Sequence, residues 1–203
     1  MWLLIFAIFF VCAAIYLIHS GLFEKIDVKV GPSPIAGRLT VYYKYHVGAY
    51  SKVHKLFKEV TDLLPKGATS IGIYYSDPHE VPESELKSAI GAVVAVNGKS
   101  LYSENYTAQL VRWGYEPIEL PQIDRAVVAV HRFTTWLSIL LAVKRVYAKI
   151  LSFVKANQLR AGPAIELYTM EREGSRSQIH FVFPLELHDS FFVAELAAGD
   201  KHD

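Results

Sequence analysis

The chain has 203 residues, and its 21 lysine and arginine residues nearly balance its 20 aspartate and glutamate residues, for a net charge of +1. This balance gives no indication of a nucleic-acid partner, because nucleic-acid-binding proteins concentrate basic residues. The single cysteine, Cys12, excludes an intrachain disulfide and a cysteine-based metal site. The residues that follow the first apolar stretch are numerous enough for one domain with its own hydrophobic core.

The first apolar stretch, Met1–Ile18, contains no charged side chain. As a helix that rises about 1.5 Å per residue, it reaches roughly 27–30 Å, about the thickness of the hydrocarbon core of a bilayer. Trp2 and Tyr16 stand near its ends, where aromatic side chains suit the headgroup level. We therefore predict a single, uncleaved transmembrane anchor over residues 1–19. A cleaved secretory signal is the alternative, although the stretch has no cationic start and only a weak cleavage site follows it.

The residues that flank the anchor predict its orientation. Lys25, Lys29 and Arg38 follow the anchor, whereas only the amino terminus precedes it. Because cationic flanks tend to stay on the cytosolic side, we expect the rest of the chain to be cytosolic. On that side of the membrane, the glycosylation sequon at Asn105 would stay unmodified.

The first half of the remaining chain predicts a strand, a helix and two further strands. Residues 20–38 are rich in proline and glycine and are predicted to be an irregular connector. Apolar and polar residues alternate over residues 39–47, which favours a half-buried strand, and residues 50–64 have the spacing of an amphipathic helix. Residues 70–75 and 89–96 are short apolar runs, and we predict a strand for each of them.

The second half repeats this order after a short helix, residues 103–113, and an extended connector between Pro117 and Pro121. The repeated elements are a continuously apolar strand expected at the centre of the sheet (126–130), a long helix (136–156), a strand (164–170), a polar turn (171–177) and an alternating strand (178–183). The pattern predicts an α+β fold: two βαββ repeats that form one antiparallel sheet with helices on one face. We expect the domain to span residues 39–187 and a C-terminal tail to occupy residues 188–203.

Several segments of the sequence resemble the GyrI-like, effector-binding domain family. They are TVYYKYHVGAY (Thr40–Tyr50), IGIYYSDPHEVP (Ile71–Pro82), KSAIGAVV (Lys87–Val94), AGPAIELY (Ala161–Tyr168) and QIHFVFPL (Gln178–Leu185). With its anchor, the whole chain resembles a branch of this family that serves as receptors in selective autophagy of the endoplasmic reticulum. The resemblance implies a single-pass adaptor of that membrane, with cytosolic partners from the autophagy or quality-control machinery.

Receptors of that branch continue into a long disordered tail, which binds ubiquitin-like autophagosome proteins through an aromatic-x-x-aliphatic motif. This sequence ends at Asp203, and the motif's shape occurs at Tyr115–Ile118 and Tyr147–Ile150. Strand addition needs a free extended backbone, whereas Pro117 interrupts the first segment and the second lies in a predicted helix. We therefore expect no direct binding of those proteins.

Glu166 is the candidate ligand-binding residue. It lies in a predicted strand and shares a face with Ala164, Tyr168 and Met170. A carboxylate among aromatic side chains suits a small cationic or aromatic ligand. The resemblance implies that a glutamate at this place contacts ligands, and that some relatives hydrolyse small molecules.

We expect Tyr75 to be the equivalent of Tyr168 in the first repeat, where Ile73 takes the place of the glutamate. The predicted ligand site is therefore Glu166, Tyr168 and Tyr75. The alternative is that Glu166 only pairs with a nearby cation, such as Arg160 or Lys144, at the surface of the sheet.

The sequence predicts no metal site, cofactor or catalytic residue. The histidines that follow the anchor lack the spacing of metal ligands; they are His46, His54, His79, His131, His180, His188 and His202. The sequence also lacks a glycine-rich phosphate loop. We expect a membrane-anchored adaptor that is not an enzyme. A membrane-tethered small-molecule-binding module is the alternative, and a small-molecule hydrolase is the third hypothesis.

Overall fold

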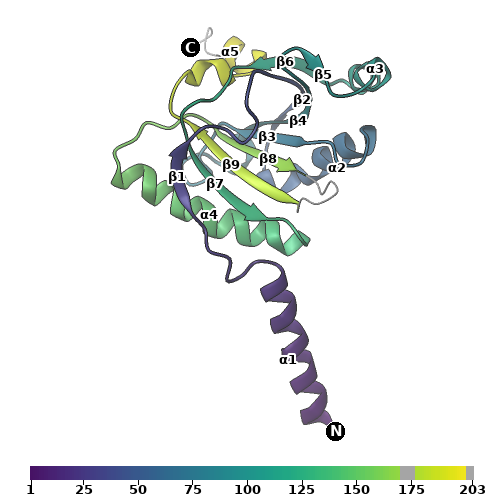
Figure 1. Ribbon diagram of the computed structural model, residues 1–203, viewed down its shortest axis with the longest axis vertical. Helices are drawn as coiled ribbons and strands as arrows, with labels where there is room; N and C mark the ends of the chain where they lie inside the picture. The colour runs from purple at the N-terminus through teal and green to yellow at the C-terminus, as the bar shows by residue number, and fades with distance from the viewer. Residues whose placement is uncertain (170–176, 200–203) are drawn as a thin grey trace.

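The computed structural model describes residues 1–169 and 177–199, which form one apolar helix and one α+β domain (Figure 1). The turn predicted over residues 171–177 falls almost wholly outside the described residues, as do Met170 and the last four residues of the chain. The predicted α+β class is confirmed, because helices pack on an antiparallel sheet.

The first helix, α1 (Trp2–His19), coincides with the apolar stretch of the sequence. It is long and apolar enough to cross a membrane, with a mean hydropathy of 2.5, and none of its residues is buried. Figure 1 shows that α1 projects away from the domain. A helix that is apolar all round and exposed all round suits lipid surroundings better than water.

In the described part of the chain, nine strands form one sheet in the order β1-β7-β9-β8-β3-β4-β2-β6, and β5 pairs with β4. The strands are β1 (Val28–Gly31), β2 (Leu39–Val47), β3 (Ser70–Tyr74), β4 (Lys87–Val96), β5 (Lys99–Ser100), β6 (Glu116–Leu120), β7 (Ala126–Arg132), β8 (Ala164–Thr169) and β9 (Gln178–Pro184). The first repeat contributes β2, β3 and β4, and the second contributes β7, β8 and β9. Because β3 pairs with β8, backbone hydrogen bonds join the two repeats at the centre of the sheet.

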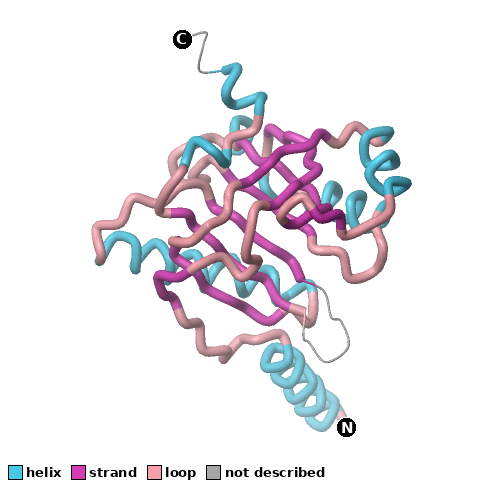
Figure 2. The backbone as a smooth tube through the Cα atoms, turned by 45° about the horizontal axis from the view of Figure 1, so that its top comes forward, coloured by secondary structure: helices cyan, strands magenta, loops and turns pink. Residues whose placement is uncertain are grey.

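Three helices cover one face of the sheet, as predicted (Figure 2). They are α2 (His54–Leu63), α3 (Glu104–Arg112) and α4 (Trp136–Ala156). The single helix predicted over residues 50–64 begins as a short 3-10 turn, and α2 follows it. Helix α4 has its predicted bounds, and its buried residues include Ala142, Val146 and Ile150, which recur every fourth position and face the sheet.

The opposite face of the sheet is covered by residues that were predicted to be a tail. They form a 3-10 helix, η3 (His188–Phe191), and the short helix α5 (Ala194–Gly199). Phe191 is 1% exposed and Val193 is fully buried, both in the core on this face of the sheet. The Tyr43 hydroxyl donates a hydrogen bond to the Glu195 carboxylate over 3.0 Å. This part of the predicted tail therefore belongs to the folded domain, because it supplies apolar side chains to the core.

Two segments predicted to be irregular are strands at the edges of the sheet. Strand β1 lies in the predicted connector and pairs with β7, while β6 occupies the predicted extended connector and pairs with β2. An edge strand has one side without a strand partner, which is why Pro117 is tolerated in β6. Since β1 forms the edge, β7 is second from the edge and not at the centre of the sheet.

The residues that follow α1 are fixed to the start of α4. Ser20 is fully buried, and its Oγ shares a hydrogen bond of 2.8 Å with Oγ1 of Thr135, the residue before α4. The neighbouring Thr134 hydroxyl donates to the carbonyl oxygen of His19 over 2.9 Å. These contacts join the last turn of α1 directly to the domain.

Farther along α4, two cationic side chains hold the same segment. Arg145 donates to the carbonyl oxygens of Gly21 and Glu24 over 2.9 and 3.0 Å, and Lys149 donates to that of Ile26 over 3.2 Å. We call residues 19–26, together with the α4 side chains and threonines that bind them, the anchor joint. The joint leaves little free linker between α1 and the domain.

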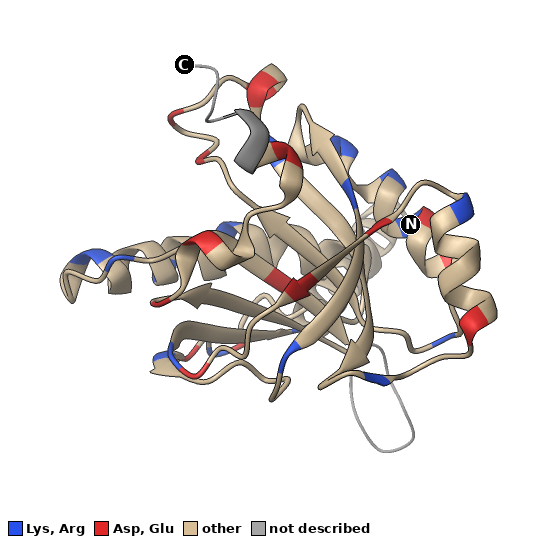
Figure 3. Cartoon of the chain, turned by 90° about the horizontal axis from the view of Figure 1, so that it is seen from above, with Lys and Arg blue, Asp and Glu red and all other residues tan. Residues whose placement is uncertain are grey.

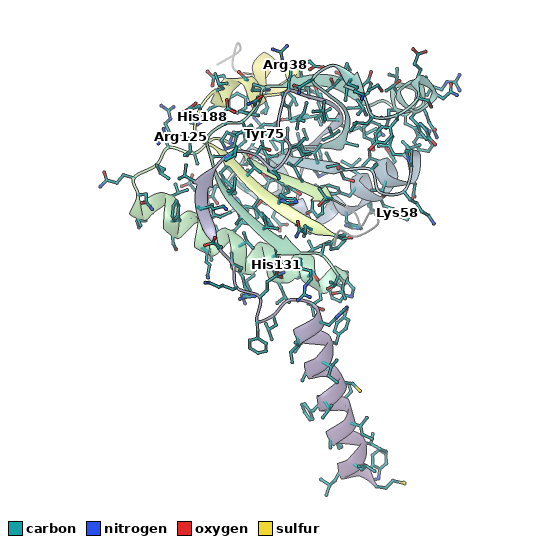
Figure 4. The ribbon with its side chains drawn as sticks, in the orientation of Figure 1. Arg38, Lys58, Tyr75, Arg125, His131 and His188 are labelled. Atoms are coloured by element: carbon teal, nitrogen blue, oxygen red, sulfur yellow. The ribbon has the colours of Figure 1, made fainter. Side chains whose placement is uncertain are left out.

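A buried histidine lies beneath the anchor joint. His131 is fully buried at the end of β7 nearest α1 (Figure 4), and its Nδ1 lies 3.3 Å from the Glu24 carboxylate. The same carboxylate accepts a hydrogen bond from the backbone N–H of Arg132. Burial lowers the pKa of His131, and the nearby Glu24 carboxylate opposes this change. Glu24 thus ties the connector to the end of β7 as well as to α4.

Candidate functional site

A buried carboxylate lies at the middle of the sheet. Glu166 of β8 is 3% exposed, and it lies opposite Gly72 of β3 on the face that carries α2 and α4. Figure 3 shows charged residues on helices, loops and several strands, but among the described residues Glu166 is the only aspartate, glutamate, lysine or arginine that is buried. An ionised carboxylate is costly to bury unless other groups satisfy it, so its partners decide what this position can do.

Tyrosine hydroxyls are those partners. The Tyr168 hydroxyl donates to Glu166 Oε2 over 2.6 Å, and the Tyr147 hydroxyl donates to Oε1 over 2.7 Å. Burial raises the pKa of the Glu166 carboxyl, and hydrogen bonds from Tyr168, Tyr147 and Tyr74 oppose this rise. We call Glu166 and these three tyrosines the tyrosine cluster.

The predicted alternative, an ion pair with Arg160 or Lys144, is not formed. Among the ion pairs of the described residues, none includes Glu166. The carboxylate therefore has hydroxyl donors but lacks a cationic partner in the part of the chain that the structure describes.

Aromatic rings surround the tyrosine cluster. The ring of Tyr168 meets that of Phe57 from α2 edge-on, with 4.9 Å between their centroids, and Tyr147 meets Phe181 of β9 at 5.5 Å. Gly72 makes room for this packing, because a Cβ there would lie 3.0 Å from both the Phe57 and the Tyr74 ring. Ring faces can attract a cation, so the surroundings of Glu166 suit a cationic or aromatic ligand.

The structure brings together two of the three predicted site residues. Glu166 and Tyr168 are in contact, whereas Tyr75 lies on the opposite face, where its hydroxyl donates to the carbonyl oxygen of Phe191 over 3.0 Å. Figure 4 places Tyr75 in the part of the domain away from α1. The preceding residue, Tyr74, is the one that faces Glu166, because successive side chains of a strand point to opposite faces.

Sequence reasoning also missed the role of Tyr147. Its position in the apolar stripe of α4 identifies it as a core residue, and no local signal connects it with Glu166. The alternation of β3 could have identified Tyr74, because Gly72 and Tyr74 share the face that is opposite to the buried Ile71 and Ile73.

Two surface depressions of the molecule do not include any residue of the tyrosine cluster. A depression of about 440 Å³ runs along β2 and includes Lys44, His46 and Glu195, and another lies on α3. Since Glu166 is almost completely covered, a ligand would reach it only after one of the neighbouring rings moves. Among the described residues, no group of three or more His, Cys, Asp or Glu side chains is placed to hold a metal ion.

The two segments with the shape of an autophagosome-binding motif are parts of the folded domain. Tyr115 is 2% exposed, and the residues after it form β6, which pairs with β2. Tyr147 lies in α4 and binds Glu166. Neither segment is a free extended strand.

Comparison with known proteins identifies relatives of the chain. The model of the family described as "GyrI-like small molecule binding domain" matches residues 38–180. Human Testis-expressed protein 264 is 33% identical over 178 residues, which cover 88% of this chain and 54% of that protein. Its mouse homolog is 33% identical over 183 residues, which cover 90% and 56%. The chain therefore spans about half the length of these curated relatives.

A solved structure supports the fold. An integron cassette protein from Vibrio cholerae superposes with a TM-score of 0.50 and covers 80% of this chain and 100% of its own. Only 8% of the aligned residues are identical, so this likeness concerns the fold alone.

Proposed function

Since the chain belongs to the GyrI-like small-molecule-binding family, we propose that it is a membrane-anchored binding protein whose tyrosine cluster takes a small cationic or aromatic ligand. The single observation that carries this proposal is that the buried carboxylate of Glu166 accepts hydrogen bonds from tyrosine hydroxyls but has no cationic partner among the described residues. A ligand cation would supply the missing charge, and the surrounding rings would add cation–π attraction.

We further propose that α1 spans the membrane of the endoplasmic reticulum and leaves the domain in the cytosol. The length and hydropathy of α1 support a membrane span, and the cations that follow it support this orientation. The particular membrane is an inference from the resemblance to receptors of that organelle.

An adaptor role in selective autophagy of the endoplasmic reticulum is the second candidate function. It is supported by the similarity to Testis-expressed protein 264, which extends over 88% of this chain. Proximity labelling with and without α1 distinguishes this role from ligand binding alone, because an adaptor should label autophagy proteins only when it is at the membrane.

A hydrolase is the third hypothesis. A carboxyl group whose pKa is raised by burial can also act as a general base. Conversion of a bound compound during the ligand screen described next would favour this hypothesis over simple binding.

We expect Glu166→Gln to weaken the binding of cationic aromatic dyes at least about 10-fold, because the amide cannot carry the negative charge that attracts the cation. Binding by the unaltered protein should also weaken as the pH falls, since the raised pKa of Glu166 leads to its protonation at a less acidic pH than usual. The measurement is fluorescence titration of the full chain in nanodiscs, over a panel of such dyes and a range of pH.

Tyr75→Phe is the matched control for this titration. It also removes a hydroxyl that binds within the domain, but on the face away from Glu166, so it should leave the affinity unchanged. Equal affinities for the unaltered protein and Glu166→Gln, or an equal loss in Tyr75→Phe, would contradict the proposed site. The melting temperature of each variant shows whether a loss reflects unfolding.

The membrane proposal predicts that the full-length chain stays with membranes during carbonate extraction. Protease added outside intact microsomes should digest the domain, and Asn105 should carry no glycan. Release of the chain by carbonate would disprove the anchor. Protection from protease, together with a mobility shift after endoglycosidase treatment, would place the domain in the lumen.

A further inference from the structure

We propose that Phe23 and the first turns of α4 form a second membrane contact, which rests on the bilayer surface beside α1. The surface consists of Trp136 and Leu140 on α4 and of Phe23, which lies between the two residues that Arg145 of α4 binds, and we call it the apron. This inference depends on the proposed membrane span of α1, and it adds a defined orientation of the domain on the lipid surface.

The contacts at the start of α4 place this helix where the chain leaves the membrane. The residue that ends α1, His19, accepts a hydrogen bond from Thr134, and the next residue, Ser20, shares one with Thr135. Trp136 follows Thr135 directly and is the first residue of α4. Since consecutive Cα atoms lie about 3.8 Å apart, Trp136 lies directly beside the residue that binds the end of α1. Figure 1 shows this end of α4 beside the upper end of α1.

The apron is apolar and unusually exposed for a folded domain. Phe23 is 76% exposed, Trp136 is 67% exposed and Leu140 is 53% exposed. Trp136 and Leu140 are four residues apart and therefore lie on one side of α4. Large apolar side chains that cluster on a surface indicate an interaction site, and tryptophan favours the interface between lipid and water.

The anchor joint explains why lipid is the expected occupant of this surface. Arg145 and Lys149 fix α4 to the carbonyl oxygens of the segment that follows α1, so the apron is held close to the membrane. Lys25 and Lys144 are exposed near the same surface, where they suit anionic headgroups. A soluble protein or a second copy of the chain would have to displace the lipid that already lies next to α1.

The test uses the three tryptophans of the chain, Trp2, Trp113 and Trp136. In each of three variants, one tryptophan is kept and the other two are replaced by phenylalanine. The full chain is placed in nanodiscs, one copy per disc, whose phosphatidylcholine carries bromine on the acyl chains near the headgroups. We expect these lipids to reduce Trp136 emission about twofold or more, because bromine quenches a tryptophan that lies at the interface.

Trp113 is the matched control, because it is 52% exposed but lies at the end of α3, far from α1 in Figure 1. Its emission should be the same with brominated and ordinary lipid. Trp2 reports on the anchor itself. If the brominated lipid does not quench Trp2, the proposed membrane span is disproved. If it quenches Trp2 but quenches Trp136 no more than Trp113, the span is supported and the apron is disproved.

A second measurement does not depend on tryptophan. Leu140→Cys, in a chain that also carries Cys12→Ala, is labelled with a nitroxide, and Val111→Cys on α3 serves as the control because Val111 is 56% exposed. The label at position 140 should collide more often with lipid-soluble oxygen than with a water-soluble nickel complex, and the label at 111 should show the reverse. Greater access of the nickel complex at position 140 would overturn the inference. So would shielding of Trp136 that arises only in discs with two copies, because it would identify a second copy as the occupant.

Discussion

Phe191→Ala is expected to lower the free energy of unfolding of the domain by about 3–5 kcal/mol, the usual cost of removing a buried phenylalanine side chain. Phe191 is 1% exposed and packs in the core on the face of the sheet opposite α2 and α4. It belongs to an apolar core to which strands of both repeats contribute, and neighbours held in a sheet cannot move far to close the cavity. Denaturant unfolding of the protein in mild detergent, followed by the fluorescence of the domain, measures the loss.

The neighbouring residue provides the control. Phe192 is 39% exposed, so Phe192→Ala should cost about 1 kcal/mol or less, although it alters the same segment and removes the same atoms. If both variants were nearly as stable as the unaltered protein, residues 188–199 would not contribute to the core. An equal large loss in both would indicate that the whole segment detaches.

Gly91→Ala is expected to cost about 3 kcal/mol or more, because the new methyl group has no space. Gly91 lies in β4 between β2 and β3, and a Cβ at this position would lie 1.9 Å from the carbonyl oxygen of Tyr42. The obstacle is a backbone atom of the paired strand. It can move only if hydrogen bonds of the sheet break, so we expect a poor yield of folded protein and a clearly lower melting temperature.

Gly31→Ala makes the same chemical change in another strand of the same sheet. A Cβ at position 31 would approach only a side-chain atom of Val128, at 3.8 Å, which is an ordinary contact. We therefore expect the stability to change by about 0.5 kcal/mol or less. Equal stability of the two variants would show that β2 and β4 approach each other less closely at Gly91 than the structure indicates.

The elements that could be predicted from the sequence are those whose pattern is local. Helices α1 and α4 are long, and the apolar residues of each identify it without information from the rest of the chain. Strands β1 and β6 could not be identified in this way, because each is short, contains or adjoins proline and becomes a strand only by pairing with a distant partner. Phe191 and Val193 belong to an apolar cluster that is too short to show a period, so its role in the core was not predictable.

The candidate site could likewise be predicted only where its residues are close together in the sequence. Glu166 and Tyr168 are two residues apart in one strand, so alternation alone places them on one face. Tyr74 and Tyr75 are adjacent, and an error of one position exchanges the two faces of the sheet. Tyr147 reaches Glu166 from α4, and its contact depends on how the helix crosses the sheet. Such a contact becomes visible only when the chain is folded.

The pairing of β1 with β7 also implies an order of events during synthesis. Roughly 120 residues separate Ile26 from Lys149, which binds its carbonyl oxygen in the anchor joint, and a ribosome that adds about 5–20 residues per second needs about 6–24 s to produce them. Strands β2, β3 and β4 lie within residues 39–96, so they can pair before β7 and α4 emerge. The anchor joint is therefore among the last contacts to form. Until it forms, the first repeat can change its orientation relative to α1, because only the connector joins them.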